Sequence, residues 1–182
     1  MDKLIGRHKE QSILKNCLES GRSEFVVIYG RRRIGKTFLV RRFFNDTYDF
    51  SFVGKHDMPR EQQLADFAKT LQRYSSSEFT PELKNWTQAF DGLAKLLEAK
   101  DTSRKKVIFF DEMPWMDTPK SDFVSSLENF WNGWAAMRDD IVFVACGSAT
   151  SWMIDSLLHN QGGLFNRITR KIYLRPFRLY EV

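Results

Sequence analysis

The sequence has few of the residues that build disulfide-bonded or zinc-binding domains. Its 182 residues include two cysteines and three histidines. Cys17 and Cys146 lie far apart and form no CxxC pair, which excludes a disulfide framework and fits a reducing compartment. His8, His56 and His159 are isolated from one another, so we expect no structural metal site. The cysteine usage predicts a cytoplasmic protein.

Long apolar runs are also missing. The longest, at residues 141–146, is far shorter than the roughly 20 residues that a membrane-spanning helix needs. The N-terminal segment MDKLIGRH is too polar for a signal peptide. The G-x-S-x-G turn of serine hydrolases is absent as well. We therefore expect no membrane partner and no serine-hydrolase chemistry.

What the chain does have is apolar and aromatic bulk. Hydrophobic residues make up 42%, with 16 Phe and 5 Trp, which is enough for the core of one domain of ordinary size. Lys and Arg number 28 against 23 Asp and Glu, for a net charge of +5. This charge permits contact with nucleic acid or acidic partners without requiring it.

Short apolar runs alternate with amphipathic stretches, which is typical of an α/β fold with a mostly parallel sheet between helices. The expected strands cover residues 24–29, 48–53, 106–110, 141–146 and 170–174. The expected helices lie within residues 2–20 and over 36–44, 60–74, 84–100, 122–138 and 151–158, with a loop at 161–163. In the helix over 122–138, Phe123, Leu127, Phe130 and Trp134 share one face because of their spacing.

The strongest motif is GRRRIGKT at residues 30–37, which fits G-x-x-x-x-G-K-[ST] between an expected strand and helix. Gly30 and Gly35 allow a tight turn that directs backbone N–H groups to one point. Lys36 is expected to reach the β- and γ-phosphates of a nucleotide, and the Thr37 hydroxyl to hold Mg²⁺. The motif predicts a phosphate-binding loop (P-loop) with ATP or ADP and Mg²⁺ as ligands.

The candidate nucleotide-binding residues of this segment are Gly30, Arg31, Arg32, Arg33, Ile34, Gly35, Lys36, Thr37 and Phe38. The partner of the three arginines stays open, since they suit phosphate, a neighbouring subunit or water alone.

A second motif is the apolar run at residues 107–110, which ends in Asp111 and Glu112. Ligands bind at the carboxyl ends of parallel strands, so both carboxylates should face the P-loop. Asp111 suits direct or second-shell coordination of Mg²⁺, and Glu112 suits the general base that activates a water. The extra strand between the two motifs favours the additional-strand, catalytic-glutamate class of P-loop proteins. GTPases usually read guanine with an N-K-x-D motif, which is absent, so ATP is favoured.

Two later strands have polar residues beside them. Ser148, or Thr150, follows the fourth strand and could bind the γ-phosphate or the attacking water; the alternative is a turn or helix cap. Arg167 precedes the fifth strand and could neutralise transition-state charge at its own or a neighbour's nucleotide; the alternative is a surface arginine.

In their order and spacing, several segments resemble the archaeal-type ATPases within the AAA+/STAND branch of P-loop proteins. They are LIGRHKE, GRRRIGKT, IFFDEMPWM, CGSATSWM, and GGLFNR followed by IYLRPF, so the resemblance covers nearly the whole chain. It implies a five-stranded sheet of order 5-1-4-3-2. It also implies a catalytic role for Glu112, a γ-phosphate sensor at Ser148 and an arginine finger at Arg167.

The resemblance further implies that Gly6 and Arg7 lie near the adenine or the hinge, with Glu10 fixing that segment. Asn166 stands where the family more often has a glycine before the arginine. Family members often continue into a helical lid, a winged-helix module and sometimes a nuclease-like domain. We therefore expect residues 1–182 to be the ATPase domain of a longer protein. Its downstream region is expected to meet a nucleic-acid or protein partner.

Three functions fit these residues. The leading hypothesis is an ATP-hydrolysing, Mg²⁺-dependent switch or motor domain, whose activity depends on a neighbouring subunit and is slow in the isolated monomer. The second is a small-molecule kinase, although a water-activating Glu112 would be counterproductive there. The third is a scaffold that binds nucleotide without useful turnover.

Overall fold

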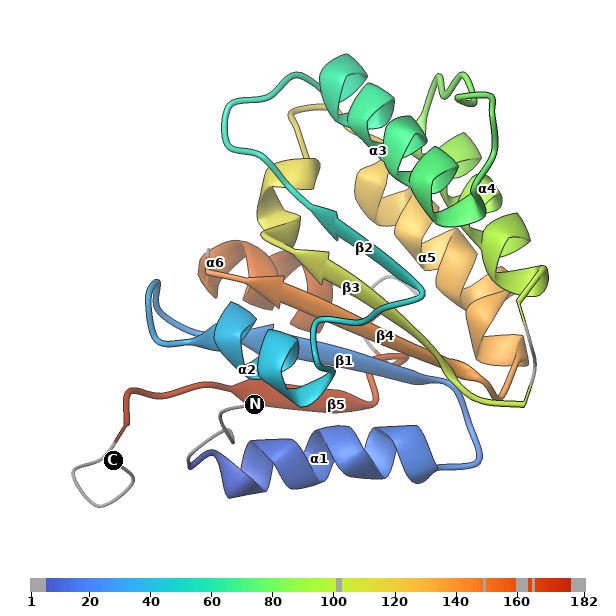
Figure 1. Ribbon diagram of the computed structural model, residues 1–182. Coiled ribbons are helices and arrows are strands. Elements are labelled where there is room, and N and C mark those ends of the chain that lie inside the picture. Colours follow the sequence, from blue (N-terminus) through green and yellow to red (C-terminus); the bar gives the residue numbers. More distant parts are fainter. Residues whose placement is uncertain (1–5, 101–102, 149, 160–163, 165, 178–182) are drawn as a thin grey trace.

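The computed structural model describes residues 6–100, 103–148, 150–159, 164 and 166–177. At its centre is a five-stranded sheet in which all neighbouring strands run parallel. The strands are β1 (Glu24–Tyr29), β2 (Phe50–Val53), β3 (Lys106–Asp111), β4 (Ile141–Gly147) and β5 (Arg170–Tyr173). Their spatial order, β2-β3-β4-β1-β5, confirms the expected arrangement (Figure 1).

The register brings the carboxyl ends of the strands to one edge of the sheet. Tyr29, the last residue of β1, lies opposite Gly147 of β4 and Tyr173 of β5. On the other side, Val53 of β2 lies opposite Asp111 of β3. The segments that follow these strands therefore leave from the same edge, where ligands of open parallel sheets bind.

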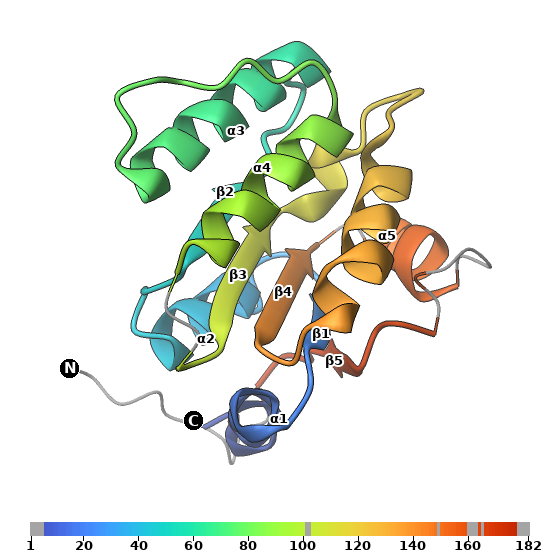
Figure 2. The ribbon, with the colours of Figure 1, turned by 90° about the vertical axis from the view of Figure 1, so that its right-hand side faces the viewer.

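Helices cover both faces of the sheet, which confirms the three-layer α/β fold (Figures 1 and 2). One face carries α1 (His8–Glu19) and α2 (Lys36–Phe43), and the other carries α3 (Arg60–Ser75), α4 (Trp86–Glu98) and α5 (Phe123–Gly133). Successive strand residues point to opposite faces. Phe25 and Val27 of β1 accordingly pack with the α3–α5 layer, while Val26 and Ile28 pack with α1 and α2. Burial on both faces explains why the strands read as continuous apolar runs.

Two helices depart from the predictions. α5 ends at Gly133 and a 3-10 turn follows at Ala135–Met137, so the prediction of one helix to residue 138 is wrong. Glycine is a poor helix former, and the indole N–H of Trp134 donates to Oε1 of Glu98 at 2.7 Å, at the end of α4. The helix predicted over residues 151–158 is α6 (Thr150–Trp152) continued by a π-helix, Met153–Leu158.

The start of β2 also differs from the prediction, since the strand begins at Phe50 rather than at residue 48. The backbone N–H of Val107 donates to the Asp49 carboxylate at 2.7 Å. At this position Val107 of β3 therefore bonds to a side chain and not to a backbone carbonyl of β2. Tyr48 instead packs its ring against Phe109, with 5.2 Å between centroids.

The cysteines and the lengths of the helices complete the description of the fold. Cys17 and Cys146 are both buried as free thiols. Within the described ranges, the helices lack the combined length and apolar character needed to cross a bilayer.

Candidate nucleotide site

The segment after β1 has the backbone that its glycines predict. Gly30 has a φ of 146° and Gly35 a φ of 92°, conformations that L side chains rarely adopt. A Cβ at Gly30 would run into the carbonyl of Leu174 and lie 2.8 Å from the side chain of Ile34. α2 begins at Lys36, so the loop leads directly into the N-terminus of a helix, the end that favours bound anions.

Lys36 is drawn into this loop. Its side chain is nearly buried, with 7% exposed, and its Nζ donates to the carbonyls of Gly30 at 2.9 Å and Arg31 at 2.5 Å. Burial lowers the pKa of Lys36, and the nearby Glu112 and Asp111 carboxylates oppose this effect. The ammonium group is therefore held inside the loop by neutral carbonyl oxygens, which a phosphate can replace.

Thr37 and Asp111 meet at the junction of the loop and β3. The Thr37 hydroxyl donates to Oδ2 of Asp111 at 2.8 Å, and Oδ1 accepts the backbone N–H of Glu112 at 2.9 Å. Burial raises the pKa of Asp111, and the hydrogen bonds from Thr37 and Glu112 act in the opposite direction. Two oxygen-bearing side chains, one from the first turn of α2 and one from the end of β3, are thus joined by a hydrogen bond.

Glu112 is held in an unusual backbone conformation. Its φ of 49° and ψ of 40° are left-handed, which costs free energy for a residue with a side chain. Its carbonyl accepts the N–H of Trp115 at 3.1 Å, within a 3-10 turn over Met113–Met116. Its Oε2 accepts a hydrogen bond from the Ser148 hydroxyl at 3.3 Å, so the structure brings together the predicted base and the predicted sensor.

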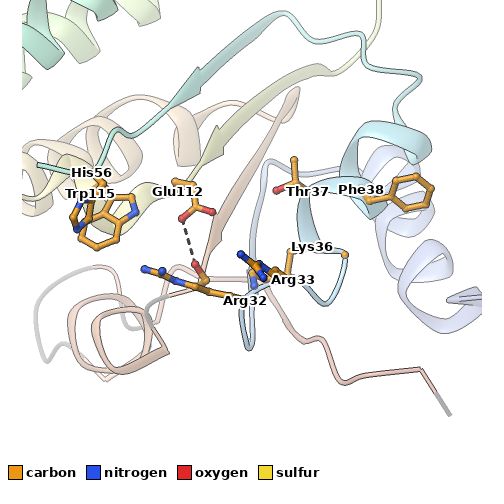
Figure 3. A pocket seen from close by; sticks show the side chains of 10 residues that line it. Arg32, Arg33, Lys36, Thr37, Phe38, His56, Glu112 and Trp115 are labelled. Atoms are coloured by element: carbon orange, nitrogen blue, oxygen red, sulfur yellow. Dashed lines mark hydrogen bonds between the residues drawn. The ribbon is translucent and has the colours of Figure 1, made fainter. Parts of the chain in front are cut away.

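These side chains face one open pocket of about 640 Å³ (Figure 3). Its lining residues are Arg32, Arg33, Gly35, Lys36, Thr37, Phe38, His56, Glu112, Trp115 and Ser148. Phe38 is 53% exposed, and the guanidinium of Arg42 lies 5.1 Å from its ring.

His56 and Trp115 were not assigned to the site by sequence reasoning. Their rings meet edge to face, with 4.2 Å between centroids. A signal for both existed: His56 follows the end of β2 and Trp115 follows the end of β3, at the edge where ligands bind.

The Gly6–Arg7 segment lies against the P-loop. Arg7 is nearly buried, and its guanidinium donates to the carbonyl of Ile34 at 3.4 Å and lies 3.8 Å from Glu10. The same guanidinium lies 4.1 Å from the centre of the Phe177 ring. The structure therefore places Arg7 beside both Glu10 and the loop, while the role of Gly6 and Arg7 toward adenine stays a prediction.

Arg167 does not join the pocket. It is exposed and precedes β5, whose Arg170 pairs with Val26 of β1. Nearby, the N–H of Thr169 donates to the carbonyl of Phe25 at 2.9 Å. This is the edge where β1 begins, whereas the P-loop follows its end. Residues 160–163 and 165, which include most of the GGLF segment and the predicted loop, lie outside the described residues.

A family model described as an ATPase domain predominantly from Archaea matches residues 4–181. The chain belongs to this ATPase family. The archaeal-type ATPase domain is 25% identical over 179 residues to the uncharacterized protein MJECL04 of Methanocaldococcus jannaschii. The match covers 96% of the chain and 36% of that relative. Membership places the ATPase domain among nucleotide-binding P-loop proteins.

Solved structures share the fold at low identity. The Walker-type ATPase PABY2304 of Pyrococcus abyssi matches with a TM-score of 0.68 and 20% identity, over 98% of this chain and 55% of that one. The Aeropyrum pernix ORC1 protein, solved in complex with DNA, matches with a TM-score of 0.68 and 11% identity, over 99% of this chain and 48% of that one. The ORC2 protein of the same organism, solved with ADPNP and ADP, matches with a TM-score of 0.64 and 16% identity, over 100% of this chain and 52% of that one. The ATPase domain thus spans about a third of the curated relative and about half of these structures.

Proposed function

We propose that the domain binds ATP with Mg²⁺ and hydrolyses it, as the switch or motor part of a longer protein. The observation that carries this proposal is the convergence of three strand ends on one pocket. Lys36 follows β1, the Thr37–Asp111 pair joins the loop to β3, and the Glu112–Ser148 pair joins β3 to β4. These residues supply the parts that phosphoanhydride hydrolysis requires: a cation for the phosphates, oxygen ligands for Mg²⁺ and a general base.

The pocket suits a polyphosphate because of its charge. Its lining holds three cationic side chains, Arg32, Arg33 and Lys36, against the single carboxylate of Glu112. Lys36 now donates to two carbonyls, and phosphate oxygens would replace these neutral acceptors with charged ones, which form stronger hydrogen bonds. Both ADP and ATP gain from this exchange.

The oxygen donors suit Mg²⁺, which prefers hard oxygen ligands and is usually held by one or two side chains plus phosphates. We assign the Thr37 hydroxyl as ligand and Asp111 as its direct or second-shell partner. The part of the chain that the structure describes holds no cluster of three or more His, Cys, Asp or Glu that would offer another metal site. When bound, the ion neutralises charge on the β- and γ-phosphate oxygens.

We assign Glu112 as the general base. In the proposed reaction, its carboxylate accepts a proton from a water whose oxygen bonds to the γ-phosphorus, while the bond to the bridging oxygen breaks. ADP and phosphate are the products. The Glu112 carboxylate accepts a hydrogen bond from Ser148, and the backbone of Glu112 is left-handed.

Binding and phosphate release by two variants test this proposal. Lys36→Ala should weaken nucleotide binding strongly, because a charge-assisted contact is lost. Glu112→Gln should keep ATP bound and slow phosphate release by roughly 10²-fold or more, as expected for loss of a general base. Lys15→Ala and Glu19→Gln on α1, whose side chains are 69% and 64% exposed, are matched controls that should change neither quantity.

The outcomes separate the alternatives. Wild-type phosphate release by Glu112→Gln would show that the base lies elsewhere. If the wild-type protein binds nucleotide tightly but releases no phosphate, the domain is a scaffold. A phosphorylated small molecule in place of free phosphate would identify a kinase.

We further propose that residues 1–182 form one domain of a larger machine. The chain covers 36% of its M. jannaschii relative, and matched ORC proteins are solved with DNA. A downstream lid and a nucleic-acid- or protein-binding module would complete such a protein. Phosphate release should then be faster in the full protein with its partner than in the domain alone, and equal rates would count against this proposal.

A further inference from the structure

Arg32 occupies a distinct part of the nucleotide pocket. It lines the pocket with Glu112 and Ser148, and its Cζ lies 6.0 Å from the centre of the Trp115 ring. Figure 3 shows its side chain extended toward Trp115, whereas Arg33 lies on the Lys36 side. The pocket therefore has a cation on the side of Glu112 that is away from the P-loop lysine.

Trp115 is fixed relative to Glu112. Its backbone N–H donates to the carbonyl of Glu112 at 3.1 Å, and its own carbonyl accepts a hydrogen bond from Nε2 of the buried Gln63 at 2.7 Å. The His56 ring, which follows β2, packs against the Trp115 ring at a near-perpendicular angle. The face of an indole ring attracts a guanidinium within about 6 Å, and the in-plane N–H groups of the guanidinium can still bind an anion.

We propose that Arg32 is a catalytic arginine that acts within its own subunit. In the proposed hydrolysis, it contacts the γ-phosphate from the Glu112 side and neutralises charge that develops as the bond to the leaving ADP breaks. It stays protonated throughout. Trp115 is its positioning residue, holding the guanidinium beside the pocket before the nucleotide arrives. This inference rests on the proposed ATPase function.

The positions of two other cationic residues, Arg167 and Lys36, support this assignment. Arg167 lies at the opposite edge of the sheet, so it does not reach the nucleotide of its own subunit from its place before β5. Lys36 is held within the loop, where its Nζ donates to the Gly30 and Arg31 carbonyls. Arg32 lines the same pocket as Glu112, and its guanidinium lies over the Trp115 ring.

The test compares ground-state and transition-state binding. ADP affinity should change little in Arg32→Ala, whereas trapping of ADP with aluminium fluoride, which mimics the transferring phosphoryl group, should be lost. Phosphate release should fall by about 10²-fold or more, as for removal of one donor to a developing oxyanion. Arg32→Lys should recover part of the rate, because it keeps charge without the planar fork. Arg41→Ala, an exposed arginine of α2 paired with Asp46, is the control.

Trp115→Leu tests the positioning role. It should lower phosphate release when Arg32 is present and add little in the Arg32→Ala background, since residues that act as one unit are not additive. Equal losses in both backgrounds would remove Trp115 from the proposal.

The two levels of the argument fail separately. A wild-type protein that binds nucleotide without releasing phosphate would overturn the proposed function. A wild-type protein that hydrolyses ATP, with Arg32→Ala hydrolysing and trapping aluminium fluoride equally well, would overturn the role of Arg32 alone.

Discussion

Replacing Gly54 with alanine would place one methyl group against the backbone of the proposed base. Gly54 follows β2, and its N–H donates to the carbonyl of Asp111 at 2.9 Å. A Cβ there would overlap the carbonyl oxygen of Glu112 and lie 3.1 Å from Cγ of Met116. The alanine itself is not strained by a left-handed φ at this position. The perturbation is therefore steric and directed at Glu112.

The size of the effect follows from that overlap. An ordinary C···O contact is about 3.3 Å or more, so the Glu112 carbonyl must move by roughly 1 Å. A misplacement of about 1 Å can cost about 10²-fold in rate. Overpacking of this kind typically costs about 1–3 kcal/mol of stability. For a domain of this size each kcal/mol shifts Tm by about 2–4 °C, so we expect a decrease of roughly 2–12 °C.

Steady-state phosphate release and thermal unfolding measure the two effects. Gly21→Ala is the matched control, because a Cβ at Gly21 meets no atom within 4 Å. It should retain the wild-type rate and Tm. ADP affinity should survive in Gly54→Ala, since the P-loop is untouched. A Gly54→Ala protein with both the wild-type rate and the wild-type Tm would refute the steric argument.

Two further predictions concern stability and assembly. The hydrogen bond from Arg138 lowers the pKa of Asp140 to about 2. The ionised Asp140 therefore stabilises the folded state fully above the unfolded pKa near 4, and this contribution is lost as pH falls toward 2. Asp140→Asn should cost about 2 kcal/mol in urea unfolding at pH 7 and much less at pH 2, whereas the exposed Asp139→Asn should cost little at either. Mixing Arg167→Ala subunits with Lys36→Ala subunits should partly restore phosphate release if Arg167 acts in trans; fast hydrolysis by an isolated monomer that Arg167→Ala leaves unchanged would contradict this role.

The P-loop could be predicted from sequence because its conformation allows few residues. Gly30 has a positive φ and a carbonyl where a Cβ would be, and Gly35 is left-handed, so the spacing of the two glycines specifies the turn. Asp111 and Glu112 could be placed because an apolar run ends at them and parallel strands end together. Strand order followed from the family resemblance and not from any pattern in the residues themselves.

Tertiary contacts decided the features that sequence reasoning missed. The contact between His56 and Trp115 joins the ends of β2 and β3, and no spacing within one segment encodes it. The end of α5 depends on Gly133 and on Trp134 reaching Glu98 of another helix. The position of Arg167 could have been inferred, since a strand parallel to β1 begins at the edge opposite the P-loop.

A switch requires that the nucleotide loop be connected to the segments by which the domain joins the rest of a protein. The loop contacts the segment before α1 and the segment after β5 at two points, and in the proposed longer protein these segments would make that connection. The segment after β5 passes the loop so closely that the carbonyl of Leu174 lies where a side chain on Gly30 would be. Arg7 bonds to Ile34 in the loop and lies over the ring of Phe177, four residues after β5 ends. If the loop moves when nucleotide binds, we expect the chain after β5 to be displaced with it, as the proposed switch function needs.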